Sequence, residues 1–115
     1  MQEFMLLFRN APHPDGYAPS PEEMQASIPK WQKWIGEIAQ QGKLVSTAPL
    51  HFEGRTIKDA KVTDGPFVEI KERVNGYLIC KAENLEEAVT FGKGCPIFDF
   101  PNGSVEVRPI MLFPM

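Results

Sequence analysis

Asp64 opens the most distinctive short segment of this chain, Asp-Gly-Pro-Phe at positions 64–67. Gly65 and Pro66 favour a turn, and the Asp64 carboxylate can accept backbone N–H groups of that turn. The same carboxylate can instead accept a proton or orient a ligand, with Lys71 as a nearby cation. The pattern alone favours the turn, because Asp-Gly and Gly-Pro steps are common in turns. Both interpretations stay open.

A second group of candidate residues follows the first apolar segment, in a proline-rich stretch. Arg9, His13 and Asp15 bring a cation, an imidazole and a carboxylate close together in sequence. Such a group can orient an anionic ligand, although a solvated loop is the more common explanation. If a pocket forms between this stretch and a sheet, we expect the following ligand-binding candidates to converge there: Arg9, His13, Tyr17, Asp64 and Lys71.

The histidines and cysteines give little support for metal or thiol chemistry. His13 and His51 lie far apart without further ligands at a suitable spacing, so we expect no metal and no cofactor. Cys95 follows the expected end of a helix, where the helix dipole raises a thiol pKa and disfavours a nucleophilic role. Cys80 lies in an apolar segment and is expected to be a buried free thiol, consistent with a reducing cytoplasm.

Composition excludes several classes of partner. The chain has 115 residues and a net charge of -3, which suits one folded domain. Lys and Arg are not clustered, so direct nucleic-acid binding is not expected. No apolar run approaches the roughly 20 residues that span a bilayer, and the apolar segment after Glu3 has no basic segment before it, unlike a signal peptide. We therefore expect a cytoplasmic protein without a membrane partner.

The first helix is predicted for residues 21–41, capped by Ser20 and ended by Gly42. Pro29 predicts a kink or a short break within it. Trp34 lies at the edge of the apolar stripe, where it can line a pocket or a dimer interface. The stripe itself, which we expect to face the sheet, consists of Met24, Ile28, Trp31, Ile35 and Ile38.

Strands and a second helix complete the expected elements. The second helix follows Asn84, and its inward residues are expected to be Leu85, Ala88, Val89 and Gly92. Strands are predicted at 3–9, 44–47, 76–81 and 104–108, with a hairpin formed by extended pieces at 51–57 and 61–63. This order predicts an α+β fold, the ferredoxin-like split βαβ antiparallel sheet with two helices on one face.

Two of the predicted strands are apolar on both faces, although the helices can cover only one face of the sheet. The segments are 4–8 and 77–80. A second copy stacked sheet to sheet would remove the exposed apolar patch, so we expect a homodimer that buries Met5 or Phe4 on the face away from the helices. A hydrophobic ligand on that face is the alternative.

Several motifs in order resemble the DGPF family of YCII-related proteins. They are Asp-Gly-Pro-Phe-Val-Glu-Ile-Lys-Glu at 64–72, Gly76-Tyr77, Leu-Glu-Glu-Ala at 85–88, Cys95-Pro96 and Gly-Ser-Val-Glu-Val-Arg-Pro at 103–109. The resemblance covers essentially the whole chain and implies one domain over residues 1–115, forming a dimeric α+β barrel. It also implies bacterial relatives encoded beside extracytoplasmic-function sigma factors. It implies no established reaction.

The chain departs from the catalytic pair suspected in the wider YCII-like group, a His on the first helix and an Asp in an Asp-Pro step after the second. The first helix contains no histidine, and Cys95-Pro96 replaces the Asp-Pro step. Two hypotheses therefore remain. One is a small-molecule enzyme or ligand-binding domain with a pocket near Asp64, and the other is a non-catalytic interaction module linked to sigma-factor regulation.

Overall fold

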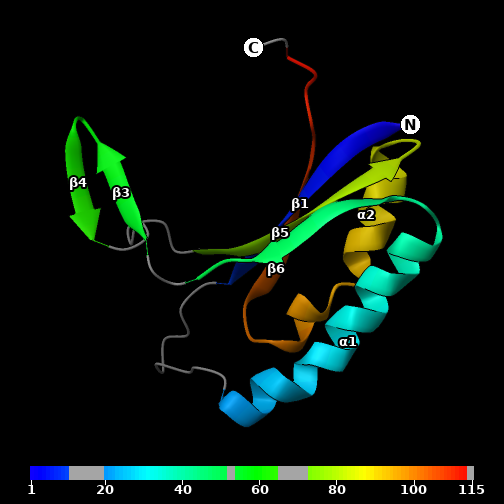
Figure 1. Ribbon diagram of the computed structural model, residues 1–115, viewed down its shortest axis with the longest axis horizontal. Coiled ribbons are helices and arrows are strands. Elements are labelled where there is room, and N and C mark those ends of the chain that lie inside the picture. Colours follow the sequence, from blue (N-terminus) through cyan, green and yellow to red (C-terminus); the bar gives the residue numbers. More distant parts are fainter. Residues whose placement is uncertain (11–19, 52–53, 65–72, 114–115) are drawn as a thin grey trace.

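A four-stranded antiparallel sheet forms the centre of the protein, as seen in a computed structural model that describes residues 1–10, 20–51, 54–64 and 73–113. The strand order is β2-β5-β1-β6, and β1 pairs antiparallel with both β5 and β6 (Figure 1). Because β5 lies between β1 and β2, the first βαβ unit is split, as predicted. The strands are β1 (Gln2–Asn10), β2 (Leu44–Pro49), β5 (Arg73–Ala82) and β6 (Gly103–Pro109).

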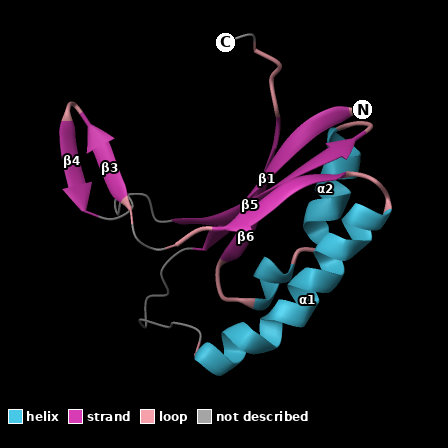
Figure 2. Ribbon diagram, in the orientation of Figure 1, coloured by secondary structure: helices cyan, strands magenta, loops and turns pink. Residues whose placement is uncertain are grey.

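Both α-helices lie on one side of this sheet (Figure 2). They are α1 (Pro21–Gln40) and α2 (Leu85–Lys93), and a short 3-10 helix, η1 (Pro96–Asp99), follows α2. The predicted ferredoxin-like α+β fold is therefore confirmed, while η1 was not anticipated. None of the helices in the described part of the chain is long and apolar enough to span a membrane.

Alternation along β1 separates the two faces of the sheet. Phe4, Leu6 and Phe8 are buried under the helices, together with Leu78 and Cys80 of β5. Of the two residues expected on the face away from the helices, Met5 or Phe4, Phe4 does not lie there, because residues at period two share a face and Phe4 shares that of Leu6.

The face of the sheet without helices, called the open face below, carries Met5 and Leu7 of β1. In the strand register Met5 lies opposite Ile79 and Leu7 lies opposite Tyr77, so the four side chains form one apolar strip. Each of the four is partly exposed. Arg9 and Glu106 border this strip and form an ion pair of 2.9 Å.

Helix α1 begins and ends as the sequence predicts. The Ser20 hydroxyl accepts a hydrogen bond from the backbone N–H of Glu23 at 3.1 Å, and Gly42 follows the helix with a φ of 71°. The helix continues through Pro29, so of the expected kink or short break, the break does not occur. Both Pro29 and Gln25 are exposed, and the Gln25 carbonyl that loses its N–H partner is left where water can hydrate it.

The apolar stripe of α1 is only half covered. Met24 and Ile28 are 52% and 50% exposed, whereas Ile38 is buried. Trp34, predicted at the edge of the stripe, belongs to the core at 7% exposed, and Trp31, predicted in the core, is only partly buried. The crossing of α1 over the sheet turns Trp34 toward the partner helix α2, where its indole N–H donates to the Phe91 carbonyl at 2.9 Å.

Helix α2 packs on the sheet through its smallest residues. Ala88 and Gly92 are buried, while Leu85 and Val89, predicted to point inward, are 43% and 36% exposed. A Cβ placed on Gly92 would lie 3.5 Å from Val105, so the helix already approaches β6 closely. Such a close approach leaves room only for small side chains on the contact line.

A separate two-stranded hairpin stands apart from the main sheet (Figure 1). It consists of β3 (Arg55–Lys58) and β4 (Lys61–Asp64), joined by Asp59 and Ala60, which both have positive φ. Positive φ at both turn residues matches the right-handed twist of the flanking strands. The hairpin predicted from the sequence is thus confirmed, with a later start than expected.

Candidate functional site

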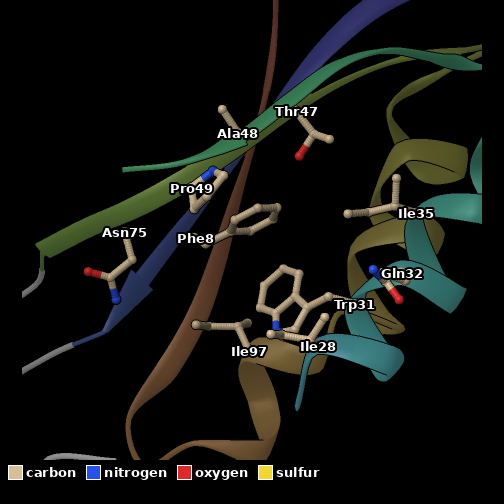
Figure 3. Close-up of a pocket in the computed structure, with 10 residues that line it drawn as sticks. All are labelled: Phe8, Ile28, Trp31, Gln32, Ile35, Thr47, Ala48, Pro49, Asn75 and Ile97. Carbon is tan, nitrogen blue, oxygen red and sulfur yellow. The ribbon is translucent and has the colours of Figure 1, made fainter. Parts of the chain in front are cut away.

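A cavity of about 320 Å³ lies between the first part of α1 and the helix-side face of the sheet. Figure 3 shows side chains from α1, β1, β2 and η1 pointing toward it. The lining residues are Phe8, Ile28, Trp31, Gln32, Ile35, Thr47, Ala48, Pro49, Asn75 and Ile97. None of these side chains carries a charge, so the cavity offers no ionic partner to a ligand from the described residues.

Two aromatic rings give the cavity its most rigid wall. The ring centroids of Phe8 and Trp31 are 5.1 Å apart at an interplanar angle of 65°. Trp34 lies behind them, 5.8 Å from each ring. Edge-to-face pairs of this kind each contribute about 0.5–1.5 kcal/mol beyond their buried area. The cluster therefore holds Phe8 and Trp31 in place beside the cavity.

Gly76 allows β2 and Phe8 to come close together at the cavity. A Cβ at this position would lie 2.9 Å from the Ala48 carbonyl oxygen and 3.3 Å from the Phe8 ring. The first of these atoms belongs to the backbone and cannot rotate away. Gly76 was predicted only as part of a strand and motif, and the close approach of β2 gives its physical role.

The polar lining residues are few and uncharged. Thr47 donates its hydroxyl proton to the Tyr77 carbonyl at 2.8 Å, so its oxygen can only accept a further hydrogen bond. Within the described residues, the side-chain amides of Gln32 and Asn75 make no hydrogen bond. These two amides lie on opposite sides of the aromatic wall in Figure 3 and are available to a ligand.

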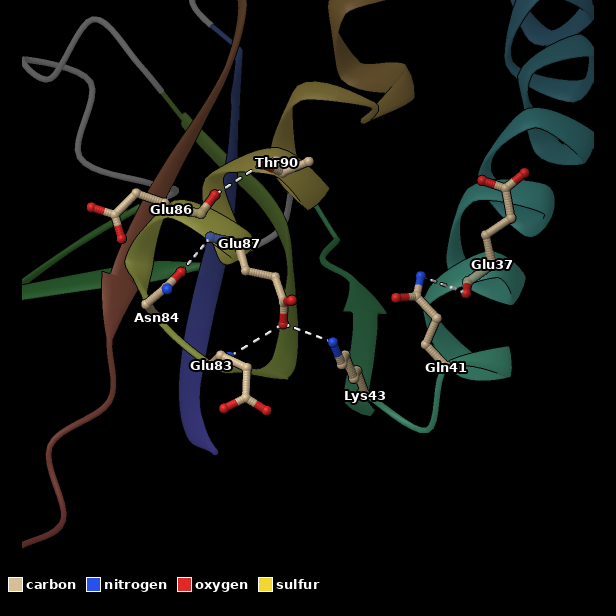
Figure 4. A network of polar contacts seen from close by, with 8 residues as sticks. All are labelled: Glu37, Gln41, Lys43, Glu83, Asn84, Glu86, Glu87 and Thr90. Atoms are coloured by element: carbon tan, nitrogen blue, oxygen red, sulfur yellow. Dashed lines mark hydrogen bonds and ion pairs between the residues drawn. The ribbon is translucent and has the colours of Figure 1, made fainter.

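A polar network outside the cavity joins α2 to the segment that leads into β2 (Figure 4). Lys43, at the start of β2, lies 2.8 Å from the Glu87 carboxylate. The same carboxylate accepts the backbone N–H of Glu83, while the Asn84 side chain accepts that of Glu87, as a helix cap does. The bond to Lys43, followed by that to Glu83, lowers the pKa of Glu87. This network stabilises the fold and faces no described cavity.

Both cysteines are free and buried. Burial raises the pKa of the Cys80 thiol to about 11 and that of the Cys95 thiol to about 12. From the sequence, we expect the helix dipole to raise the pKa of Cys95. Desolvation by burial is the larger cause. Neither thiol has the electropositive, accessible surroundings of a reactive cysteine.

The predicted site residues are only partly described. Arg9 lies on the open face in its ion pair with Glu106 and does not line the cavity. Asp64 ends β4, where its backbone pairs with Arg55. His13, Tyr17 and Lys71 lie outside the described residues, so the predicted convergence stays a prediction. His, Cys, Asp and Glu side chains in the described part of the chain form no group of three that could hold a metal.

Comparison with known proteins identifies the family. The model of the YCII-related domain matches residues 3–114. The chain belongs to the YCII-related family. A relative, the uncharacterised protein R00369 of Rhizobium meliloti (strain 1021), is 35% identical over 80 residues, which cover 69% of this chain. The matched region spans 61% of that relative's length, so the relative has further sequence that this chain does not match.

A solved structure gives a second comparison for this YCII-related protein. It is 5-chloro-2-hydroxyhydroquinone dehydrochlorinase of Burkholderia phenoliruptrix AC1100, in complex with 2,5-dihydroxybenzoquinone. The similarity has a TM-score of 0.47 at 18% identity and covers 91% of this chain and 90% of the other.

Proposed function

We propose that this YCII-related protein binds a small, uncharged and largely apolar molecule in the cavity between α1 and β2. The uncharged lining carries this proposal, because a charged ligand would lose its hydration there without gaining an ionic partner. The volume of about 320 Å³ lies at the lower end of the range for small-molecule sites, about 300–1,000 Å³. Half-exposed Ile28 adds apolar surface that a ligand can cover.

The described lining residues support binding rather than catalysis. They include no carboxylate, imidazole, thiol or amine that could transfer a proton. Asp64 therefore remains the candidate for an acid or base. If Asp64 acts on a ligand, Asp64→Asn will abolish binding or turnover of that ligand while leaving the melting temperature unchanged or higher. If Asp64→Asn binds and turns over the ligand like the wild type, Asp64 has only a structural role in the turn.

The binding proposal can be tested with the neutral fluorescent probe N-phenyl-1-naphthylamine. We expect saturable binding to the wild-type protein and its loss in Ile28→Trp, since the larger side chain fills the cavity. Met24→Trp is the matched control, because Met24 is equally exposed on the same helix but does not line the cavity. Equal binding by wild type and both variants would contradict the proposal and leave the interaction module linked to sigma-factor regulation as the alternative.

We further propose that two copies pair through the open face. The apolar strip of Met5, Leu7, Tyr77 and Ile79 supports pairing, because it would otherwise contact water in a soluble protein. Charges of both signs border the strip, including Arg9 and Glu106, so a two-fold axis can bring opposite charges together. Sedimentation equilibrium at micromolar concentration should give twice the chain mass, and Leu7→Asp should give a monomer. A monomeric wild type would rule this pairing out.

A further inference from the structure

Two apolar segments project from the protein with almost no covering. On the hairpin, Ile57 and Val62 lie directly opposite each other in the strand register and are 72% and 62% exposed. After β6, Met111, Leu112 and Phe113 are 80%, 94% and 67% exposed. Single exposed apolar residues are ordinary, but runs and pairs at such exposures are typical of interaction surfaces. They are called the hairpin arm (55–64) and the terminal arm (111–113) below.

Both arms lie on the same side of the sheet. Figure 1 shows the hairpin arm and the terminal arm on the side away from α1 and α2, with the open face between them. The terminal arm starts directly after Ile110, whose backbone N–H still donates to the Glu3 carbonyl at 2.9 Å. The arms therefore border the surface through which the pairing proposed above takes place.

The open face by itself lies near the lower limit for a stable dimer. Four strands spaced about 4.8 Å apart, with about 3.4 Å per residue along the nine residues of β1, give a face of roughly 600 Å² in flat projection. A stable interface buries roughly 600–1,000 Å² on each partner. Surface outside the sheet would bring the interface to the middle of this range, and the two arms are apolar surface in the right place.

The hairpin arm also needs a partner for its own stability. An isolated two-stranded hairpin is marginal in water unless an apolar face packs against something else. The cross-strand pair of Ile57 and Val62 is such a face, and no described part of this chain covers it. A surface of matching apolar character is the strip of Met5, Leu7, Tyr77 and Ile79 with its borders, on a second copy.

We infer that the hairpin arm and the terminal arm of each protomer pack against the other protomer and supply a large share of the dimer interface. This inference rests on the proposed pairing through the open face. The two-fold relation lets each protomer give two arms and receive two, so all four exposed apolar segments become buried at once. The partner that covers the arms is a second copy of this chain.

The test compares the dimer dissociation constants of arm variants by sedimentation equilibrium. Ile57→Thr with Val62→Thr keeps the strand propensity of the hairpin arm, and Leu112→Ser with Phe113→Ser changes only the terminal arm. Each double variant should raise the dimer dissociation constant at least about tenfold, since each removes about 1.4 kcal/mol or more of stabilisation from apolar burial. The matched control is Met24→Ser with Phe98→Ser, two half-exposed residues outside the arms, and it should leave the dissociation constant unchanged.

The outcomes separate this inference from the pairing itself. If Leu7→Asp gives a monomer while both arm variants dimerise like wild type, the open face pairs but the arms do not contribute, and the inference is wrong. A second measurement checks the contact directly. Chains carrying Leu112→Cys, mixed with chains carrying Leu7→Cys, should form mixed cross-links with a short bifunctional thiol reagent. Cross-linking no faster than between Met24→Cys and Leu7→Cys chains would also overturn the inference.

Discussion

The ammonium group of Lys43 lies 2.8 Å from a carboxylate oxygen of Glu87, and this contact joins the start of β2 to the first turn of α2. The two residues are far apart in sequence, and only the fold brings them together. Lys43 also lies 5.8 Å from the centre of the Phe91 ring on the same helix. The pair therefore fixes how α2 sits against the end of the sheet.

The first prediction concerns the pH dependence of this ion pair. The pKa of Glu87 is lower in the folded protein than its usual value of 4.5, so the pair stabilises the fold fully above about pH 4.5. That stabilisation is lost as the pH falls through the lowered pKa. Glu87→Gln should melt at a lower temperature than wild type at pH 7, and this difference in melting temperature should disappear at acid pH. Thermal melts from pH 2 to pH 7 measure it.

Glu86→Gln provides the control for this experiment. Glu86 lies in the same first turn but makes no ion pair among the described residues. Its substitution should produce only the small effect of removing a charge from a helix N-terminus. A pH-independent difference between wild type and Glu87→Gln would contradict the role given to Lys43.

The second prediction separates the two tryptophans. Trp34→Phe removes the indole hydrogen bond to the Phe91 carbonyl, which keeps the backbone N–H of Gly94 as a donor, and should lower the free energy of unfolding by about 0.5–1.5 kcal/mol. Trp31→Phe removes part of a cavity wall without breaking a hydrogen bond in the described part of the chain, so its cost should be smaller. Urea unfolding of both variants tests the order. A larger loss for Trp31→Phe would contradict the assignment of Trp34 to the core.

The third prediction concerns Gly76. Gly76→Ala forces the Ala48 carbonyl to move and should destabilise the protein by about 1–3 kcal/mol. Gly36→Ala is the matched control, because nothing lies within 4 Å of its added Cβ and alanine favours a helix by up to about 1 kcal/mol. In urea unfolding, we expect Gly76→Ala to lower the free energy of unfolding and Gly36→Ala to raise it. An unchanged free energy of unfolding for Gly76→Ala would show that the β2 backbone can move away from the added methyl group at little cost.

The fourth prediction concerns the two thiols. Cys80 and Cys95 are buried, with pKa values raised to about 11 and about 12. At pH 8 the folded protein should react with an aromatic disulfide reagent far more slowly than the unfolded protein, in which both thiols should react at once. Absorbance of the released thiolate measures both rates. Rapid modification of Cys95 in the folded state would reopen a chemical role for that thiol.

The sequence by itself determined the strands, the two α-helices and their order. Ser20 capping α1, Gly42 ending it and Asn84 capping α2 are local interactions, so short motifs were enough to predict them. Alternation along 4–8 likewise predicted two apolar faces for β1, and a split βαβ fold follows from the order of the elements.

Only the tertiary structure decided which apolar side chains face which neighbours. A helical stripe marks a direction, but the angle at which α1 crosses the sheet placed Trp34 in the core and left Trp31 beside a cavity. The close approach of α2 likewise selected Ala88 and Gly92 over Leu85 and Val89. Distances between elements depend on all the packed side chains together, and sequence spacing within one element does not contain them.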